Sequence, residues 1–493
     1  MFDQDESSPT YGYGDRKYWA WGLSDFSNGS MQGAVNGLSK LLLHDLLQIA
    51  SQEKVIKLIK SAFIATQKIT RQDGSLEESF PYEGSYCVTA LVAFDLLSAV
   101  ENLQSFINSE VKAEFLSIVE PLIAFIKKND ENHAIISNHL ATAAAAIIKW
   151  NSITGCEDYR KANQLLDIVI DNQSNEGWFR EYEGPDPGYQ SLAIYYLADI
   201  YRMRPDNGFL LKLMKSIEFL QFFVHPDGSF GGIYGSRNTR FYFPSGMEFL
   251  STLSETASAI SHRMRNSIAN NSVITLSCID DGNLIPMFNS YAWSATINLN
   301  PTKQTLPCDN QPFTKHFNNC GILIDRGRKH YSIINYSKGG VVYHFVDGLI
   351  KNLDCGVLLE NKKGIQFSTQ NWRNNKVNLC EKSIKIDVCI ERSNRQKNSP
   401  YKQLILRILC LSIMRNLQLR EFVKKLMVQI LITKKSKPVG MNTRLIQLGQ
   451  NLSIVDKISI NRMPSMKKLD IKSFICIHMA SQGYFQRSDN YAP

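Results

Sequence analysis

The sequence predicts an α+β multidomain protein, in which an N-terminal, incomplete (α/α) toroid is followed by an antiparallel, β-sandwich-like domain. Three observations predict this class. Long helical patterns alternate with loops rich in Gly, Pro and aromatic residues in the first half, these patterns recur with a regular period, and short β-branched runs take over beyond about residue 270. The chain has 493 residues, enough for two domains, which we expect over 1–268 and 269–493.

The repeat in the first half is marked by the places where a loop gives way to a helix. The expected helices begin near Met31, Tyr86, Asn138, Tyr189 and Met247, so successive starts lie 55, 52, 51 and 58 residues apart. Such a period accommodates two helices with their connections, and five such hairpins side by side form an open toroid. If alternate helices line its inner wall, they begin at the same mouth. Helix N-termini present free N–H groups and a positive dipole end, so this mouth favours anionic ligands.

The loops before three of these helices share a Gly turn, acidic or amide side chains, and aromatic rings. They span 72–86, 175–189 and 226–246. An aromatic ring stacks on the C–H face of a sugar while polar neighbours bond to its hydroxyls. The substrate-binding residues expected here are Trp178, Tyr182, Tyr234, Asn238 and Glu248. Packing between hairpins is the competing interpretation for each aromatic side chain.

The second half has the pattern of an antiparallel sheet with one basic helical segment. The runs 321–337 and 339–346 predict consecutive antiparallel strands with a glycine turn between them. Residues 400–437 predict one or two amphipathic helices, and strands resume after Pro438.

This segment carries the formal charge of the whole chain, which is +9. One acid, Glu421, stands between residues 397 and 437 against ten basic side chains: Lys397, Lys402, Arg407, Arg415, Arg420, Lys424, Lys425, Lys434, Lys435 and Lys437. Helices packed on the sheet with their charges in solvent are the plainer interpretation, and contact of 403–437 with an anionic membrane or glycan is the alternative. Because the rest of the chain is near neutral, we expect no nucleic-acid partner.

The spacing of the cysteines predicts whether the protein binds a metal, and the first residues of the sequence predict where in the cell it is found. The ten cysteines form no C-x-x-C pair and no cluster with histidine at metal-ligand spacing, so we expect reduced thiols and neither a metal nor another cofactor. The first residues lack the features of a secretory signal, and no stretch offers 18 uncharged apolar residues. We therefore expect a cytoplasmic protein, peripheral to a membrane if the basic segment binds one. A misassigned start would leave export open.

The residues best suited to chemistry stand at two neighbouring helix starts. Asn138 and His139 precede the small residues ATAAAA. Helix capping alone explains the Asn, but an adjacent amide and imidazole at an anion-attracting mouth can also hold a carboxylate. Tyr189 follows one hairpin later, in a loop stiffened by two prolines. A phenol exchanges protons near neutral pH only when a cation lowers its pKa from about 10, and Arg237 or its competitor Arg240 could supply that charge.

The order of Asn138-His139, Tyr189 in GPDPGY and Arg237 in GSRNT resembles the heparinase II/III-like polysaccharide lyases. The architecture of that family covers most of the chain, while its motifs are confined to 136–250. The resemblance implies β-elimination at a uronic acid of an anionic polysaccharide or oligosaccharide, of the glycosaminoglycan or alginate kind. It implies that Asn138 and His139 hold the carboxylate, that Tyr189 acts as acid and base, and that Arg237 steadies the tyrosinate or the substrate charge. The family also brings a catalytic His or Tyr from the β domain, for which the candidates are His316, His330, Tyr343 and His344.

Three other functions stay open on the residues alone. A glycoside hydrolase on a similar toroid needs two carboxylates about 5 to 10 Å apart. The acids available near the mouth are Glu78, Glu83, Glu181, Asp186 and Glu248. A non-catalytic glycan-binding or assembly protein for surface polysaccharides needs no complete catalytic set. A terpene-cyclase-like toroid shares the D-G-S loops, but the aspartate-rich motif of such enzymes is not found in the sequence.

Overall fold

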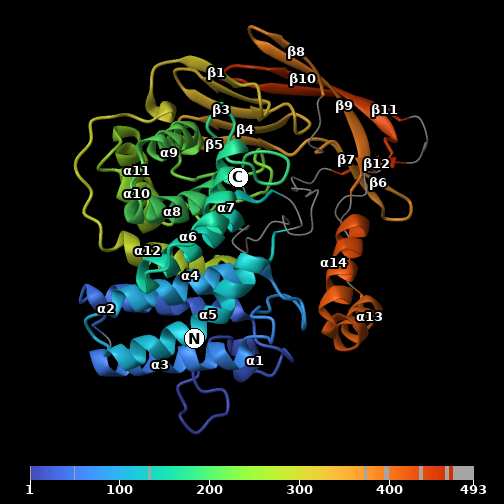
Figure 1. The fold of residues 1–493 in the computed structure, drawn as a ribbon. Helices are drawn as coiled ribbons and strands as arrows, with labels where there is room; N and C mark the ends of the chain where they lie inside the picture. Colours follow the sequence, from blue (N-terminus) through green and yellow to red (C-terminus); the bar gives the residue numbers. More distant parts are fainter. Residues whose placement is uncertain are drawn as a thin grey trace.

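The computed structural model describes residues 2–48, 50–131, 135–370, 375–393, 399–431, 437–460 and 466–469, with only the backbone described at residue 425 and over 427–431. Helices fill the first part of the chain, and strands fill most of the second (Figure 1). The helices of the first part are α1 (Arg16–Trp19), η1 (Gly29–Ala34), α2 (Val35–Leu43), α3 (Gln52–Ile69), α4 (Tyr86–Asn102), α5 (Ser109–Lys128), α6 (Ser137–Thr154), α7 (Arg160–Asp171), α8 (Pro187–Met203), α9 (Asn207–Leu220), η2 (Gln221–Phe223), α10 (Pro244–Leu250), α11 (Glu255–Ala269), α12 (Asp281–Ser294) and η3 (Pro307–Asp309).

The helices form two concentric layers, as the period of the sequence predicts. The inner layer contains α2, α4, α6, α8, α10 and α12, each packed on the next, and α12 packs back on α2. The outer layer contains α3, α5, α7, α9 and α11. In the inner helix α6 the run Ala141–Ala146 is buried, because small side chains let neighbours approach from every side. The outer helix α7 buries only Ala162, Leu165 and Val169, one stripe at helical spacing.

The helical part extends beyond the predicted domain boundary. Residue 268 lies near the end of α11, whereas α12 follows it and completes the inner ring. Asn289 of α12 joins it to the first inner helix, since its Oδ1 accepts from Gly37 N at 2.9 Å and its Nδ2 donates to Gly33 O at 3.0 Å. The sequence pattern did not predict α12, because Pro286 interrupts its helical signal. The first strand begins only at Phe313.

The strands form two antiparallel sheets. Their bounds are β1 (Phe313–Phe317), β2 (Ile322–Arg326), β3 (His330–Asn335), β4 (Val341–Val346), β5 (Leu349–Asp354), β6 (Leu358–Asn361), β7 (Gln366–Ser368), β8 (Lys376–Cys380), β9 (Ser383–Arg392), β10 (Gly440–Gln447), β11 (Ser453–Ile460) and β12 (Met466–Lys468). The first sheet has the order β1-β2-β3-β4-β5, and the second has the order β11-β10-β9-β7-β6-β12, with β8 beside β9. The run 321–337 thus holds two strands rather than one. Gly339 and Gly340, both at φ 73°, make the turn into β4 as predicted.

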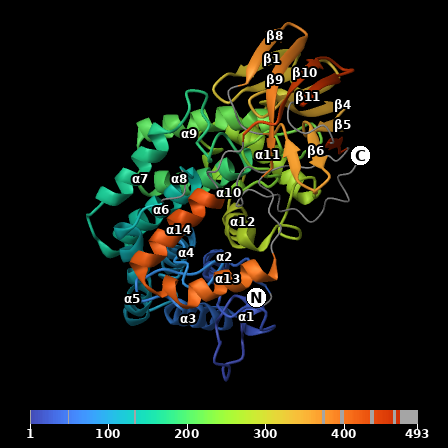
Figure 2. The same cartoon turned by 90° about the vertical axis from the view of Figure 1, so that its right-hand side faces the viewer.

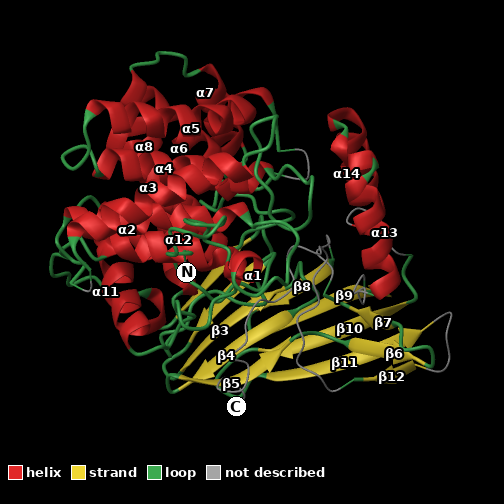
Figure 3. Ribbon diagram, turned by 90° about the horizontal axis from the view of Figure 1, so that it is seen from below, coloured by secondary structure: helices red, strands yellow, loops and turns green. Residues whose placement is uncertain are grey.

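Figure 3 shows the strands gathered on one side of the toroid helices. The first sheet lies between the helices and the second sheet, because its two faces belong to different cores. Side chains alternate along its strands, so Ile333 and Tyr343 belong to the large core shared with the helices. Ile334 and Val342 point the other way and meet Ile386 and other side chains of the second sheet. The predicted α+β class, a toroid followed by a β-sandwich-like domain, is therefore confirmed, and one core runs through both parts.

A helical hairpin leaves the second sheet between β9 and β10. It consists of α13 (Pro400–Leu411), η4 (Ile413–Arg415) and α14 (Leu417–Leu431), which confirms helices in the basic segment, while residues 432–436 lie outside the described part. In Figure 2, α14 runs in front of the toroid helices α4 and α6. Nowhere in the described ranges is a helix both long enough and apolar enough to span a membrane.

Candidate active site

A cavity of about 350 Å³ opens where several inner helices begin. Its walls come from the first residues of α4, α6, α8 and α12 and from the loops before them, so the predicted mouth exists. The volume falls in the range of small-ligand sites. The polar or titratable side chains in its lining are Glu78, Ser79, Glu83, Ser85, Tyr86, Cys87, Glu131, Asn138, His139, Tyr182, Tyr189, Arg237, Asp280, Asn283 and Lys424.

Asn138 and Arg237 are held from behind by one carboxylate. Asn138 Nδ2 donates to Glu181 Oε2 at 2.9 Å, and Arg237 Nη1 donates to Glu181 Oε1 at 3.0 Å. The loop that carries Glu181 is pinned to the start of α6, because Ser137 N donates to Arg180 O at 3.2 Å. Burial raises the pKa of Glu181, while the positive charge of Arg237 opposes that rise. The three side chains are almost fully buried and form a fixed bridge along the cavity wall.

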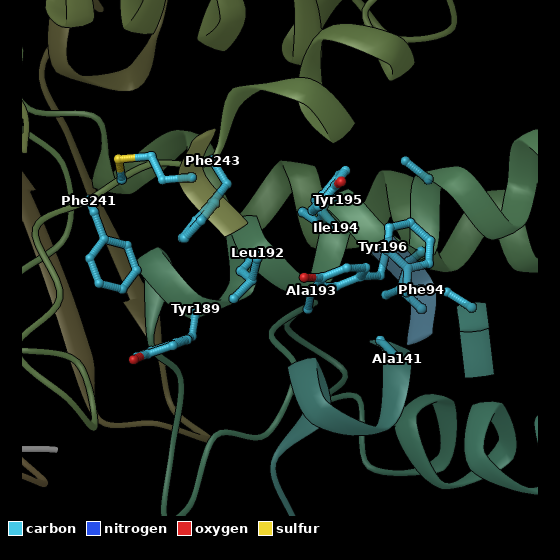
Figure 4. Close-up of a cluster of buried hydrophobic side chains, with 14 of the residues drawn as sticks. Phe94, Ala141, Tyr189, Leu192, Ala193, Ile194, Tyr195, Tyr196, Phe241 and Phe243 are labelled. Atoms are coloured by element: carbon cyan, nitrogen blue, oxygen red, sulfur yellow. The ribbon is translucent and has the colours of Figure 1, made fainter. Parts of the chain in front are cut away.

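Tyr189 lies next to this bridge at the start of α8. The guanidinium carbon of Arg237 is 3.8 Å from the centroid of the Tyr189 ring, and Phe241 meets that ring edge-on with centroids 5.2 Å apart (Figure 4). Asp186 caps the helix, since its Oδ1 accepts from Tyr189 N at 3.1 Å and its Oδ2 accepts from Arg237 N at 3.0 Å. One buried carboxylate therefore joins the tyrosine loop to the arginine loop. Burial raises the pKa of Asp186 to about 6.

His139 has its own acidic partner. Its Nδ1 lies 2.9 Å from Glu131 Oε2, and its ring also hydrogen-bonds with Cys87 of α4. Burial alone would lower the pKa of His139, but Cys87 and Glu131 outweigh burial and raise that pKa well above the usual value. The Glu131 carboxylate therefore favours the protonated, imidazolium form of His139 in the cavity.

A second group of charges lies where the cavity reaches the loop before α4. Glu83 Oε2 accepts from the backbone N of Ser79 at 2.7 Å, and Ser85 Oγ donates to Glu78 Oε2 at 3.0 Å. Burial, followed by the charge of Glu78, raises the pKa of Glu83 to about 7. Lys424 of α14 lines the same part of the cavity.

The structure brings five of the nine predicted site residues to the cavity: Asn138, His139, Tyr182, Tyr189 and Arg237. It places the other four elsewhere. Trp178 donates from Nε1 to Glu176 at 3.2 Å, and Asn238 lies buried in the arginine loop. Tyr234 is fully buried with its hydroxyl 2.8 Å from His225 Nε2, and Glu248 is fully buried in an ion pair with Arg265 at 2.7 Å.

The four candidates from the β domain do not line the cavity either. His330 lies 2.9 Å from Asp325, and His344 Nδ1 lies 2.8 Å from Ser332 Oγ. Tyr343 packs against His225, and His316 belongs to the edge strand β1. The β domain instead reaches the cavity through Lys424, which the sequence pattern marked only as one of ten basic residues.

Several residues of the cavity were not predicted because their signals depend on the fold. Glu131 is eight positions before His139, and Cys87 belongs to another hairpin. Asn283 belongs to α12 and Asp280 caps it, and this helix was not predicted at all. Within the described ranges, no group of three or more His, Cys, Asp or Glu side chains is arranged to hold a metal ion.

Comparison with known proteins gives similarity in fold only. No protein-family model matches the chain, and no curated protein matches it. Among solved structures, heparinase III has a TM-score of 0.47 at 12% identity, over 85% of this chain and 63% of that one, so this chain spans less than two thirds of its length. A cellobiose 2-epimerase from Bacillus thermoamylovorans has a TM-score of 0.40 at 12% identity, over 55% and 82%. A glycosyl hydrolase family 88 protein from Bacteroides vulgatus has a TM-score of 0.38 at 10% identity, over 53% of this chain and 91% of that one. Scores this low carry no argument about activity.

Proposed function

We propose that this chain is a sugar-active enzyme, and more specifically a polysaccharide lyase that cleaves a uronate-containing glycan by β-elimination. One observation carries the proposal. Asn138, His139, Tyr189 and Arg237, which the sequence singles out together, come from three successive repeats and converge on one cavity.

The chemistry of elimination matches the groups in the cavity. Loss of the proton on C5 of a uronate places negative charge on the adjacent carboxylate, which needs hydrogen-bond donors already in place. In the proposed complex, the Asn138 amide donates to that carboxylate, and His139 donates to it from Nε2, the ring nitrogen that Glu131 does not bind, in place of the bond with Cys87. Glu181 and Glu131 hold these two donors in position from behind.

Tyr189 is the proposed proton carrier. As a phenolate beneath the Arg237 guanidinium, it takes the proton from C5. The C4–O4 bond breaks, a C4=C5 double bond forms, and the tyrosine hydroxyl returns its proton to the departing O4. One chain leaves with a new hydroxyl and the other with an unsaturated uronate, so atoms and charge balance.

The test is to incubate the full chain with a panel of uronate polymers and to follow the ultraviolet absorbance of the unsaturated product. We expect Tyr189→Phe to lower the rate by at least about 100-fold, as loss of a general acid–base does. Tyr201→Phe is the matched control, because Tyr201 belongs to the same helix but not to the cavity lining. Full activity in Tyr189→Phe, or no product from any uronate polymer, would refute the proposal.

A glycoside hydrolase is the second candidate, and Glu83 favours it. A general acid must be protonated near neutral pH, and burial together with Glu78 raises the pKa of Glu83 to about 7. New reducing ends without absorbance, lost in Glu83→Gln, would establish hydrolysis in place of elimination. Glycan binding without either product would instead support an assembly role.

A further inference from the structure

The α13–α14 hairpin is fastened to the toroid beside the cavity. Arg420 Nη2 lies 2.7 Å from Asp73 Oδ2, and their side chains are only 7% and 12% exposed. The guanidinium rests on the backbone at Gly84, which has φ 60°, and a Cβ there would lie 2.8 Å from it. A glycine at this position therefore lets the arginine lie against the loop. This ion pair joins a helix of the β domain to the loop that leads into α4.

Other basic side chains of the hairpin also point toward the toroid. Arg407 pairs with Asp25 at 3.2 Å, and the guanidinium carbon of Arg415 lies 5.4 Å from the centroid of the Tyr82 ring. Four of the ten basic residues of this segment, Arg407, Arg415, Arg420 and Lys424, thus contact the toroid or its cavity.

Lys424 lies one helical turn beyond Arg420 and belongs to the cavity wall. Its ammonium donates to Gly84 O at 3.3 Å, which uses one of three donors. Its ion pair with Glu421 is long, at 3.8 Å, and the Glu421 side chain is 42% exposed, so this pair is weak. The Glu83 carboxylate also attracts the Lys424 ammonium. This attraction is only partial at neutral pH, because burial raises the pKa of Glu83 to about 7 and keeps part of it protonated. The ammonium can therefore bind a further anion.

We propose that Lys424 binds an anionic group of the glycan, a carboxylate or a sulfate ester, on a sugar unit next to the one that reacts. Lys424 lies beside the start of α4, whereas Tyr189 belongs to α8, two inner helices further along the ring. One sugar unit therefore contacts the Asn138 end, and its neighbour contacts Lys424. The proposal rests on the proposed function for the reaction, but the binding step needs no elimination.

The test measures binding rather than turnover, in the full chain carrying Tyr189→Phe so that the probe is not consumed. Two hexasaccharides serve as probes for calorimetric titration, an unsulfated oligouronate and a sulfated uronate–hexosamine. We expect Lys424→Gln to raise the Kd of at least one probe by about 5- to 20-fold, as loss of one charge-assisted hydrogen bond does. The probe with the larger loss shows whether Lys424 reads a carboxylate or a sulfate.

Two further variants separate a specific contact from bulk charge. Lys402→Gln removes the same charge from α13, where the side chain is exposed, and should leave both Kd values within about twofold of the parent. Lys424→Arg keeps the charge and should retain most of the affinity. Unchanged binding in Lys424→Gln, an equal loss in Lys402→Gln, or failure of the parent to bind either probe would overturn the proposal. If Lys424→Gln weakens binding as predicted but the wild-type chain yields no unsaturated product, the elimination reaction is refuted and the binding role of Lys424 stands.

Discussion

Replacing Glu181 tests the bridge on which the candidate site is built. The Glu181 side chain is 4% exposed and binds both Asn138 and Arg237, whose side chain is 6% exposed. In Glu181→Ala the buried guanidinium loses this counter-charge and the amide loses its acceptor. Removing one partner of a buried ion pair costs about 3–5 kcal/mol, so the free energy of unfolding should fall by that amount. Glu181→Gln keeps the shape and one acceptor, and should fall between wild type and alanine.

Urea unfolding followed by tryptophan fluorescence measures the loss. Glu114→Ala is the matched control, because Glu114 pairs with Lys60 at 3.5 Å with both side chains more than 40% exposed. Such an exposed pair contributes about 0–1 kcal/mol. If Glu181→Ala costs no more than Glu114→Ala, the carboxylate does not hold the wall of the cavity and the reasoning fails.

Three further predictions concern pH and packing. Burial lowers the pKa of His225 to about 4, so on acidification the histidine takes up a proton in the unfolded chain before it does in the folded one. The free energy of unfolding of the wild type should therefore fall between about pH 6.5 and 4. In urea unfolding, His225→Gln should show a fall over this range that is smaller by about 2–3 kcal/mol. Glu131→Gln removes a carboxylate that raises the pKa of His139, so the histidine should lose its proton at a lower pH than in wild type. Measurements of Kd against pH should then show that the variant loses its affinity for an anionic glycan at a lower pH. Arg444, which is 1% exposed, donates from Nε and Nη2 to Asp456, both at 2.8 Å; Arg444→Lys cannot reproduce this fork and should cost about 2–3 kcal/mol in urea unfolding.

The fold could be predicted where local chemistry sets it. Helix starts at Tyr86 and near Tyr189 follow capping residues, Ser85 and Asp186, whose side chains accept from the first turn. Strand runs and the glycine turn before β4 follow from β-branched residues and positive φ. The missed helix α12 has Pro286 in its middle, and its place in the ring depends on contacts with α2, more than 240 residues earlier in the chain.

The site could be predicted in part for a similar reason. Asn138, Tyr189 and Arg237 stand at repeated helix starts or in Gly-rich loops, which sequence spacing shows. The bridge through Glu181 joins residues 43 and 56 positions away, and spacing says nothing about which acid will lie between them. The same limit explains Glu248, which stands at a mouth-facing helix start but is taken by an arginine of the next helix, α11.

The first sheet has consequences for how the two halves can be separated. Its strands β3 and β4 are buried along nearly their whole length, because one face meets the toroid and the other meets the second sheet. A fragment ending after α12 would expose the apolar surface of the toroid that packs on the first sheet. A fragment beginning at β1 would expose the matching face of that sheet. The halves are thus unsuited to separate expression or to exchange between proteins. A recombination event that kept the toroid alone would leave an exposed apolar surface that promotes aggregation.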